Sequence, residues 1–107
     1  MKIVAVTSCA TGIAHTYMAA EALERAAKAA GHEIWVETQG AGGLKPIPAD
    51  IIAAAEVCIF ANDIGIRDAD RFAHLPTVKS IPKNAIKNAG ELIDQAVALV
   101  NGNSKDF

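Results

Sequence analysis

The fold is decided by residues 3–31, which read IVAVTSCATGIAHTYMAAEALERAAKAAG. The stretch opens with a continuous apolar run at residues 3–6, which is typical of a strand that is covered on both faces. A short connection containing Gly12 follows, and a helical pattern then runs from about Ile13 to Ala30. The next residue is a glycine, a common helix C-cap because it adopts the left-handed conformation at little cost. A buried strand followed at once by a long helix indicates an α/β protein.

The rest of the chain repeats this alternation of strand and helix. Strands are expected at residues 33–38, 57–61 and 77–81, and helices at residues 49–55 and 89–100. The first and third strands are apolar throughout and should be central, whereas the second and fourth alternate with charged residues and should be edges. With right-handed crossovers, this pattern predicts a three-layer α/β fold, flavodoxin-like or Rossmann-like, whose four-stranded parallel sheet has the order 2-1-3-4 with helices on both faces.

Composition limits the classes of function. The chain has 107 residues, of which 51% are hydrophobic and 5% aromatic, and its net charge is −2. We expect one domain at residues 1–101, and a polar tail or linker start at residues 102–107. No basic stripe is present to neutralise phosphates along a duplex, which disfavours nucleic-acid binding. We expect a cytoplasmic location, because the sequence has no signal peptide and no apolar run near the roughly 18–20 residues of a membrane span.

The predicted sheet has a candidate site where its strand order reverses. Ligands of such sheets bind beyond the carboxyl ends of the strands at this point. Thr7, Ser8 and Cys9 end the first strand there, and Asn62 and Asp63 follow the third strand across the crevice. Next to Cys9 a helix is expected to begin, whose first N–H groups lack partners and carry partial positive charge. Such groups favour a thiolate over a thiol and can hold a phosphoryl group carried on sulfur.

The residues alone leave other interpretations open. A cysteine near a strand end is often a small buried hydrophobe, and Cys58, inside the third strand, is interpreted as structural. The two cysteines lack the spacing of a metal site. His32 and His74 have no partner in the pattern and should be surface residues. The charged segment at residues 67–71 is interpreted as a solvated connector, with a docking rim as the alternative.

One absence separates two classes of cysteine enzyme. Cysteine-dependent protein phosphatases carry the pattern C-x5-R-[ST], in which the arginine binds phosphate through two parallel hydrogen bonds. In this chain Cys9 is followed, after five residues, by His15 and Thr16, so histidine replaces the arginine. A loop with fewer fixed charges should bind phosphate less tightly and favour hydrolysis less. That suits a carrier, which passes its phosphoryl group on.

These residues make the chain resemble the fructose-family IIB domains of the bacterial phosphoenolpyruvate-dependent sugar phosphotransferase system. The most specific match is residues 7–24, TSCATGIAHTYMAAEALE, and a second is residues 36–40, VETQG. Moderate matches occur at residues 61–64 and 70–72, so the resemblance covers nearly all of the chain. The chain departs from the family at Ala10, where proline is frequent. It also departs at residues 44–48, where the family's loop is often longer and acidic.

The resemblance implies a function for the site. Cys9 would accept a phosphoryl group from a phosphohistidine on a IIA domain and donate it to a sugar, fructose or fructose-like, bound by the membrane-embedded IIC domain. The residues that would hold the phosphoryl group are Ala10, Thr11, Gly12, Ile13, Ala14, His15 and Thr16. Neither a cofactor nor a metal ion is implied, and the domain would act in the cytoplasm or at the membrane through its IIC partner.

Two other classes of function remain as alternatives. The first is a cysteine-dependent phosphatase or an enzyme like arsenate reductase. The missing arginine argues against the phosphatase, and the lack of a resolving cysteine near Cys9 argues against the reductase. The second is a non-catalytic regulatory module with a IIB-like fold, against which the presence of Cys9 argues.

Overall fold

The computed structural model describes residues 1–8, 13–39 and 46–100, and of residues 13–15 it describes the backbone alone. The expected polar tail at residues 102–107 lies outside the described residues. The elements, in chain order, are β1 (Lys2–Ser8), α1 (Ile13–Ala29), β2 (Glu33–Gln39), α2 (Ala49–Ala54), β3 (Val57–Asn62), the 3-10 helix η1 (Ala69–Phe72), β4 (Thr77–Ser80), α3 (Pro82–Lys87) and α4 (Ala89–Val100).

The four strands form one parallel sheet of order β2-β1-β3-β4. β1 pairs with β2 on one side and with β3 on the other, so that Ala5 lies between Val36 and Ile59. β3 continues the sheet to β4, with Ile59 beside Val78. The predicted strand order and the placement of the two charged strands at the edges are therefore confirmed.

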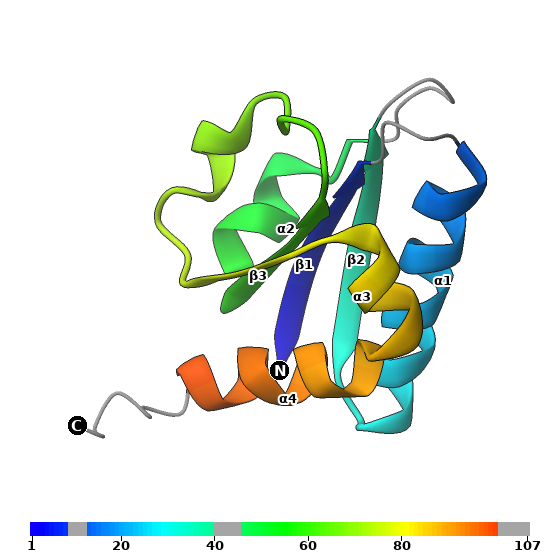
Figure 1. Cartoon of the computed structure of the whole chain (residues 1–107). Helices are drawn as coiled ribbons and strands as arrows, with labels where there is room; N and C mark the ends of the chain where they lie inside the picture. The colour runs from blue at the N-terminus through cyan, green and yellow to red at the C-terminus, as the bar shows by residue number, and fades with distance from the viewer. Residues whose placement is uncertain (9–12, 40–45, 101–107) are drawn as a thin grey trace.

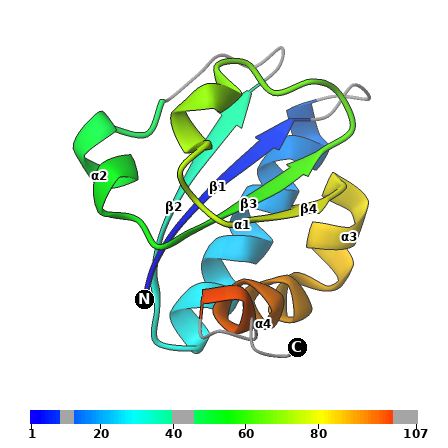
Figure 2. The ribbon, with the colours of Figure 1, turned by 90° about the vertical axis from the view of Figure 1, so that its left-hand side faces the viewer.

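Helices cover both faces of the sheet and complete three layers (Figures 1 and 2). Ile3 and Ala5 of β1 point to the face that carries α1, α3 and α4, where Leu23 of α1 joins the core. Val4 and Val6 point to the opposite face, which α2 and η1 cover. Successive side chains of a strand alternate between faces, so a strand that is apolar at every position must be covered on both.

The first helix ends where its glycine predicts. Gly31 has a φ of 85°, in the left-handed region, and the His32 N–H donates to the Ala27 carbonyl at 2.9 Å. This hydrogen bond is typical of a helix closed by glycine. Within the described ranges, no helix has both the length and the apolar character needed to cross a membrane.

Two short elements were absent from the sequence prediction. α3 begins at Pro82, whose fixed φ suits a first helical position, while Ile81 before it is extended. Asn88 ends α3 and directly precedes α4, where its carbonyl accepts from the Leu92 N–H at 3.2 Å, while its side chain donates to Asn84 Oδ1 at 2.9 Å. The second element is η1, in a segment that was expected to be a solvated connector. Both helices are too short for hydrophobic periodicity to reveal them.

We expect the core on the α4 face to tolerate truncation poorly. Leu92 of α4 is 2% exposed, whereas Leu99 of the same helix is 37% exposed. Leu92→Ala should lower the free energy of unfolding by about 2–4 kcal/mol, because it removes buried methyl groups and leaves a cavity. Leu99→Ala is the matched control and should cost less than about 1 kcal/mol. Urea denaturation measures both, and equal losses for the two variants would contradict this description of the core.

Candidate functional site

The carboxyl ends of β1, β2 and β3 meet at one edge of the sheet. The register sets Ser8 of β1 beside Gln39 of β2 and Asn62 of β3. The Asp63 N–H donates to the Ser8 carbonyl at 3.0 Å. Because β2 and β3 lie on opposite sides of β1, the strand order reverses at this edge. The predicted meeting of Ser8 with Asn62 and Asp63 at the switch point is therefore confirmed.

α1 starts at the same edge and is tied to β1 (Figure 1). It begins at Ile13, so residues 9–12 are all that connects it to β1. The Thr7 hydroxyl donates to the Thr16 carbonyl at 3.2 Å, and both residues are buried. The positive end of the α1 dipole therefore lies at the edge where β1 ends.

Among the predicted site residues, Thr16 is described in full and is 3% exposed. The backbone of residues 13–15 forms the first turn of α1, but their side chains are outside the description. The predicted nucleophile Cys9 and the predicted phosphate-binding residues 10–12 also lie outside the described residues. The roles assigned to these residues therefore stay predictions.

Ser8 places a buried hydroxyl directly before the predicted nucleophile. Its side chain is 1% exposed, and Oγ has no hydrogen-bond partner among the residues that the structure describes. Strand alternation puts this side chain on the α2 face, with Val4 and Val6. Buried hydroxyls are normally paired, and none of the described residues pairs with this one.

A buried carboxylate beside this edge was not expected from the sequence. Glu37 of β2 is 1% exposed, and its Oε1 accepts hydrogen bonds from Arg71 Nη1 at 2.9 Å and from the Ile47 N–H at 3.0 Å. Its Oε2 accepts from Arg71 Nη2 at 2.9 Å and from Gln39 Nε2 at 2.7 Å. Both oxygens are thus satisfied, as a buried carboxylate requires. The cluster joins β2, the approach to α2, and η1.

The ionised form of Glu37 is favoured despite burial. Desolvation is the largest influence and raises the pKa of Glu37. The hydrogen bonds from Arg71, Gln39 and Ile47, together with the Arg71 charge, more than offset it, so the pKa lies below its usual range. In return, the hydrogen bond with Glu37 raises the pKa of Arg71. The cluster therefore contains a carboxylate and a guanidinium at neutral pH.

Arg71 departs from the interpretation of residues 67–71 as a solvated connector, whereas Arg67, Asp68 and Asp70 are exposed as that interpretation expects. Its side chain is 29% exposed, and its guanidinium lies 4.9 Å from the centre of the Phe72 ring. Phe72 is itself buried and packs edge-on against Phe60 at 5.6 Å between ring centres. A sequence match at residues 36–40 and another at residues 70–72 were the available signal, but neither shows that the two segments meet.

Cys58 is structural, as predicted. It is fully buried in β3, and desolvation is the main cause that raises the pKa of its thiol to about 12. A neutral, buried thiol is a poor nucleophile, because the thiolate is the reactive form.

The two histidines with described side chains have backbone partners that the sequence pattern did not indicate. His32 Nδ1 lies 3.3 Å from the N-terminal amine of Met1, and His74 Nε2 lies 3.3 Å from the Ile52 carbonyl oxygen. His74 remains exposed, in agreement with the expectation of a surface residue. Within the described part of the chain, no three His, Cys, Asp or Glu side chains gather in a way that could hold a metal ion.

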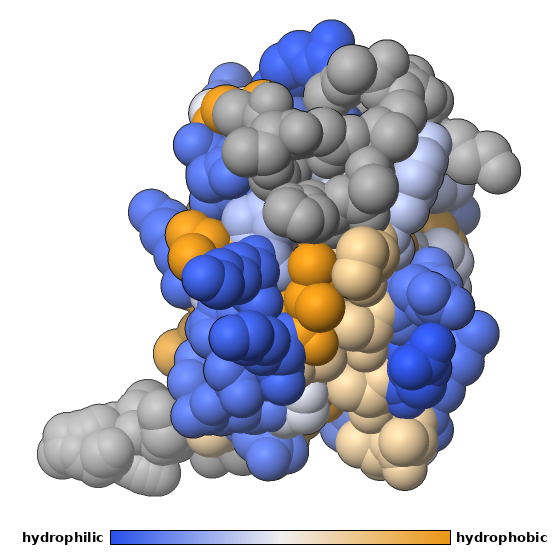
Figure 3. All heavy atoms as spheres, turned by 45° about the vertical axis from the view of Figure 1, so that its right-hand side comes forward, coloured by the Kyte–Doolittle hydropathy of each residue, from blue (hydrophilic) through white to orange (hydrophobic). Residues whose placement is uncertain are grey.

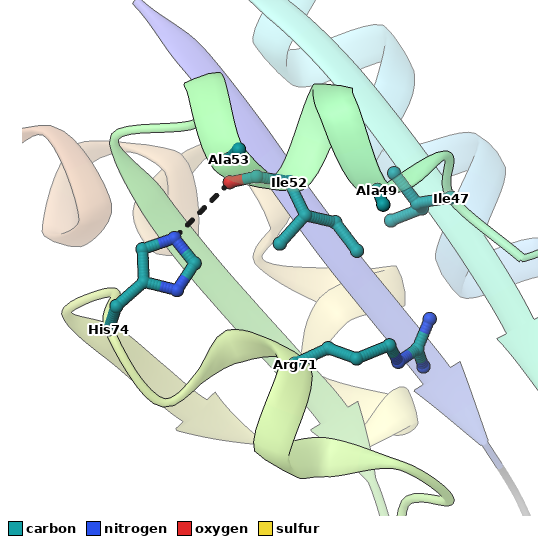
Figure 4. A pocket seen from close by; sticks show the side chains of 6 residues that line it. All are labelled: Ile47, Ala49, Ile52, Ala53, Arg71 and His74. Carbon is teal, nitrogen blue, oxygen red and sulfur yellow. Dashed lines mark hydrogen bonds between the residues drawn. The ribbon is translucent and has the colours of Figure 1, made fainter.

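A cavity of about 230 Å³ opens on the α2 face. It is lined by Ile47, Ala49, Ile52, Ala53, Arg71 and His74 (Figure 4). Apart from Arg71 and His74 the lining is aliphatic, and the Arg71 guanidinium at one side is already bound to Glu37. The cavity thus offers an apolar wall and no free anion-binding group.

The α1 side of the molecule exposes apolar surface. Figure 3 shows a strip of apolar residues between hydrophilic areas on this side. Met18 on α1 and Ile81 next to α3 are each 49% exposed. An apolar strip with a polar border is the kind of surface that proteins use for contacts with one another.

Comparison with known proteins identifies the family. The family described as "PTS system, Lactose/Cellobiose specific IIB subunit" matches residues 4–95. The chain is also 48% identical over 98 residues to the "PTS system fructose-like EIIB component 2" of Escherichia coli K12, which covers 91% of this chain and 92% of that protein. The chain belongs to the IIB family of the sugar phosphotransferase system. The resemblance in the sequence motifs is confirmed.

One relative is named as a combined EIIBC component, and the solved structure of another IIB subunit has the same fold as this chain. A "Fructose-like PTS system EIIBC component" of Escherichia coli K12 is 43% identical, and the match covers all of this chain but 22% of that protein. The solution structure of an Enzyme IIB subunit from Escherichia coli K12 superposes with a TM-score of 0.87 at 36% identity, covering 97% of both chains. The predicted flavodoxin-like fold is therefore confirmed.

The Glu37 cluster should make the stability of the IIB domain depend on acid. A carboxyl group whose pKa is lower in the folded than in the unfolded protein stabilises the folded state. For Glu37 this contribution is complete above the unfolded pKa, near 4.5, and it is lost as the pH falls through the lower folded pKa. Glu37→Gln should therefore be less stable at neutral pH by about 1–3 kcal/mol and should lose less stability than the wild type on acidification. Urea denaturation as a function of pH measures this difference.

Glu21→Gln, in an exposed pair with Arg25, is the control. Identical pH dependence of Glu37→Gln and wild type would contradict the prediction.

Cys58 should resist alkylation in the folded protein. In a Cys9→Ser variant, which leaves Cys58 as the single thiol, iodoacetamide at about pH 8 should label the protein only when urea unfolds it, because the folded thiol is buried and neutral. Intact mass follows the labelling. Rapid labelling without urea would show that β3 does not bury this thiol.

Proposed function

We propose that this IIB domain carries a phosphoryl group on Cys9, between a phosphohistidine of a IIA domain and a sugar bound to a membrane-embedded IIC domain. The observation that carries the proposal is the position of Cys9 in a member of the IIB family. It directly follows the central strand β1, at the edge where the strand order reverses and α1 begins. That edge is where ligands bind in open α/β sheets.

The transfer would take place in two displacements. In the first, the Cys9 thiolate attacks the phosphorus of a phosphohistidine whose other ring nitrogen is protonated, the S–P bond forms, and the N–P bond breaks, so that a neutral imidazole that keeps this proton is left on the IIA domain. In the second, a sugar hydroxyl attacks phosphorus, the S–P bond breaks and the thiolate is regenerated, while a base at the sugar site takes the hydroxyl proton. Catalysis of such steps depends mainly on positioning and on stabilising charge on the phosphoryl oxygens.

The first turn of α1 supports the first displacement. Residues 10–16 would hold the phosphoryl oxygens through unpaired N–H groups and through the side chains of Thr11, His15 and Thr16. The positive end of the α1 dipole favours both the thiolate and the dianionic phosphoryl group. The hydrogen bond from Thr7 to the Thr16 carbonyl supports this role, because it ties the helix start to the strand that precedes Cys9.

The partners and the sugar follow from the relatives rather than from the site. Relatives carry fructose in their names, and one unites IIB and IIC in a single chain. We therefore propose fructose or a fructose-like sugar as the acceptor, and a phosphorylated IIA domain as the donor. The carrier domain would span residues 1–101, with residues 102–107 as a polar tail, and would work on the cytoplasmic side next to its IIC partner.

Cys9→Ser should abolish phosphoryl acceptance. The domain is incubated with a fructose-class IIA domain phosphorylated on histidine, and the phosphoryl group is located by intact mass and peptide mapping at neutral pH. We expect one phosphoryl group, on Cys9 in the wild type and absent in Cys9→Ser, because serine at neutral pH is far less nucleophilic than a thiolate.

Cys58→Ala is the matched control and should still be labelled, since Cys58 is buried in the sheet. Labelling of Cys9→Ser at the wild-type rate would remove Cys9 as the acceptor. Fast release of inorganic phosphate from the labelled wild type would favour the phosphatase alternative instead.

A further inference from the structure

The connection between β3 and η1 passes over the end of β1. At the start of this crossing segment (residues 63–67), the Asp63 N–H donates to the Ser8 carbonyl at 3.0 Å. At its end, the Arg67 N–H donates to Gln39 Oε1 at 2.8 Å, and Gln39 Nε2 donates to the Arg67 carbonyl at 3.1 Å. The segment thus runs from the end of β3 to the end of β2, and β1 lies between these strands (Figure 2).

The buried Glu37 cluster fixes the far end of the crossing segment. Gln39, which holds Arg67 by both backbone groups, is itself bound to Glu37 Oε2 at 2.7 Å. Arg71 binds both oxygens of Glu37, and it also donates from Nη2 to the Arg67 carbonyl at 3.3 Å and from Nε to the Asp68 carbonyl at 2.9 Å. All three guanidinium nitrogens therefore donate, and the orientation of the side chain is fixed.

Stability alone is a weak explanation for this arrangement. Removing two charges from water is costly, and apolar side chains of similar volume often stabilise a core as well as a buried ion pair does. The two parallel hydrogen bonds between Glu37 and Arg71 fix the distance and the relative orientation of the two side chains, which an apolar contact does not do. It joins β2 to the segment that ends at Arg67, next to the strand that leads into Cys9.

The crossing segment lies on the face to which the Ser8 hydroxyl points. Gln39 and Ser8 are register partners on neighbouring strands, which are about 4.8 Å apart. Cys9 is the next residue of the chain, and the site proposed for its phosphoryl group lies at the ends of β1, β2 and β3 that this segment crosses. Displacing a reacting group by about 1 Å can lower a rate on the order of 100-fold.

We propose that Glu37, Gln39 and Arg71 are positioning residues for phosphoryl transfer at Cys9, because they hold the crossing segment as a wall of the site. The proposal rests on the proposed function. The three side chains take no part in bond making or breaking. Their effect is to keep the segment from moving while phosphorus passes from the donor nitrogen to the Cys9 sulfur.

The test compares Glu37→Gln and Arg71→Lys with the wild type. Arg71→Lys keeps the positive charge but loses the planar fork that binds Glu37 at both oxygens. With a histidine-phosphorylated IIA domain as donor, we expect kcat for labelling of Cys9 to fall about 10-fold or more in both variants, with KM changed less than about threefold. Alkylation of Cys9 by iodoacetamide should stay within about twofold of wild type, because it depends on the thiolate and not on the wall.

Two controls separate positioning from loss of structure. Leu92→Ala weakens the core on the opposite face and should transfer at the wild-type rate under conditions in which it is folded. Glu21→Gln breaks an exposed ion pair, to Arg25, and should have no effect. Amide hydrogen exchange gives a readout that does not depend on transfer. The Arg67 N–H should exchange faster in Glu37→Gln than in wild type, while amides of α4 should keep their protection.

The outcomes distinguish this proposal from the proposed function. If the wild type is not labelled on Cys9, the proposed function fails, and this inference fails with it. If the wild type is labelled and both variants keep kcat within about twofold, the positioning role alone is overturned. It is also overturned if kcat falls in Glu37→Gln but not in Arg71→Lys, because charge rather than geometry would then be decisive.

Discussion

The structure depends on β1 being hydrogen-bonded along both of its edges to parallel strands. This pairing places β1 in the middle of the sheet, where the helices on both faces bury residues 3–8. It also brings the carboxyl ends of β2 and β3 to either side of Ser8. The chain passes from β1 to β2 on one side and then returns past β1 to β3 on the other side, so the strand order reverses at β1. The connection that contains Cys9 begins at this point, beside the positive end of α1.

The second constraint is the buried carboxylate of Glu37, which differs from an ordinary ion pair of the same chain. Glu21 and Arg25 are 71% and 75% exposed at 3.2 Å, and such surface pairs contribute a few tenths of a kcal/mol. Glu37 is 1% exposed, and both of its carboxylate oxygens accept hydrogen bonds. Removing the Arg71 guanidinium would therefore leave a buried negative charge uncompensated. The cluster therefore links three segments that are distant in sequence: β2, the approach to α2, and η1.

Much of the fold could be predicted because its signals are local. The apolar run at residues 3–6, the helical pattern that ends before Gly31, and the charged alternation of β2 each indicate their own element and its place in the sheet. The family followed from motifs at residues 7–24 and 36–40, which the comparisons confirm. The short helices α3 and η1 were missed, since six or four residues carry too little periodicity to be recognised.

The sequence by itself determined the order of the strands in the sheet, the central place of β1 and the family, because hydrophobic periodicity, glycine caps and specific motifs depend on residues that are close together in the chain. Only the tertiary structure decided that Glu37 is buried and that Arg71 binds it. The alternation of β2 shows that Glu37 shares a face with Glu33, but not that η1 covers this face at one end of the strand. Burial of a charge depends on what packs over it, and here the partner lies 34 residues further along the chain.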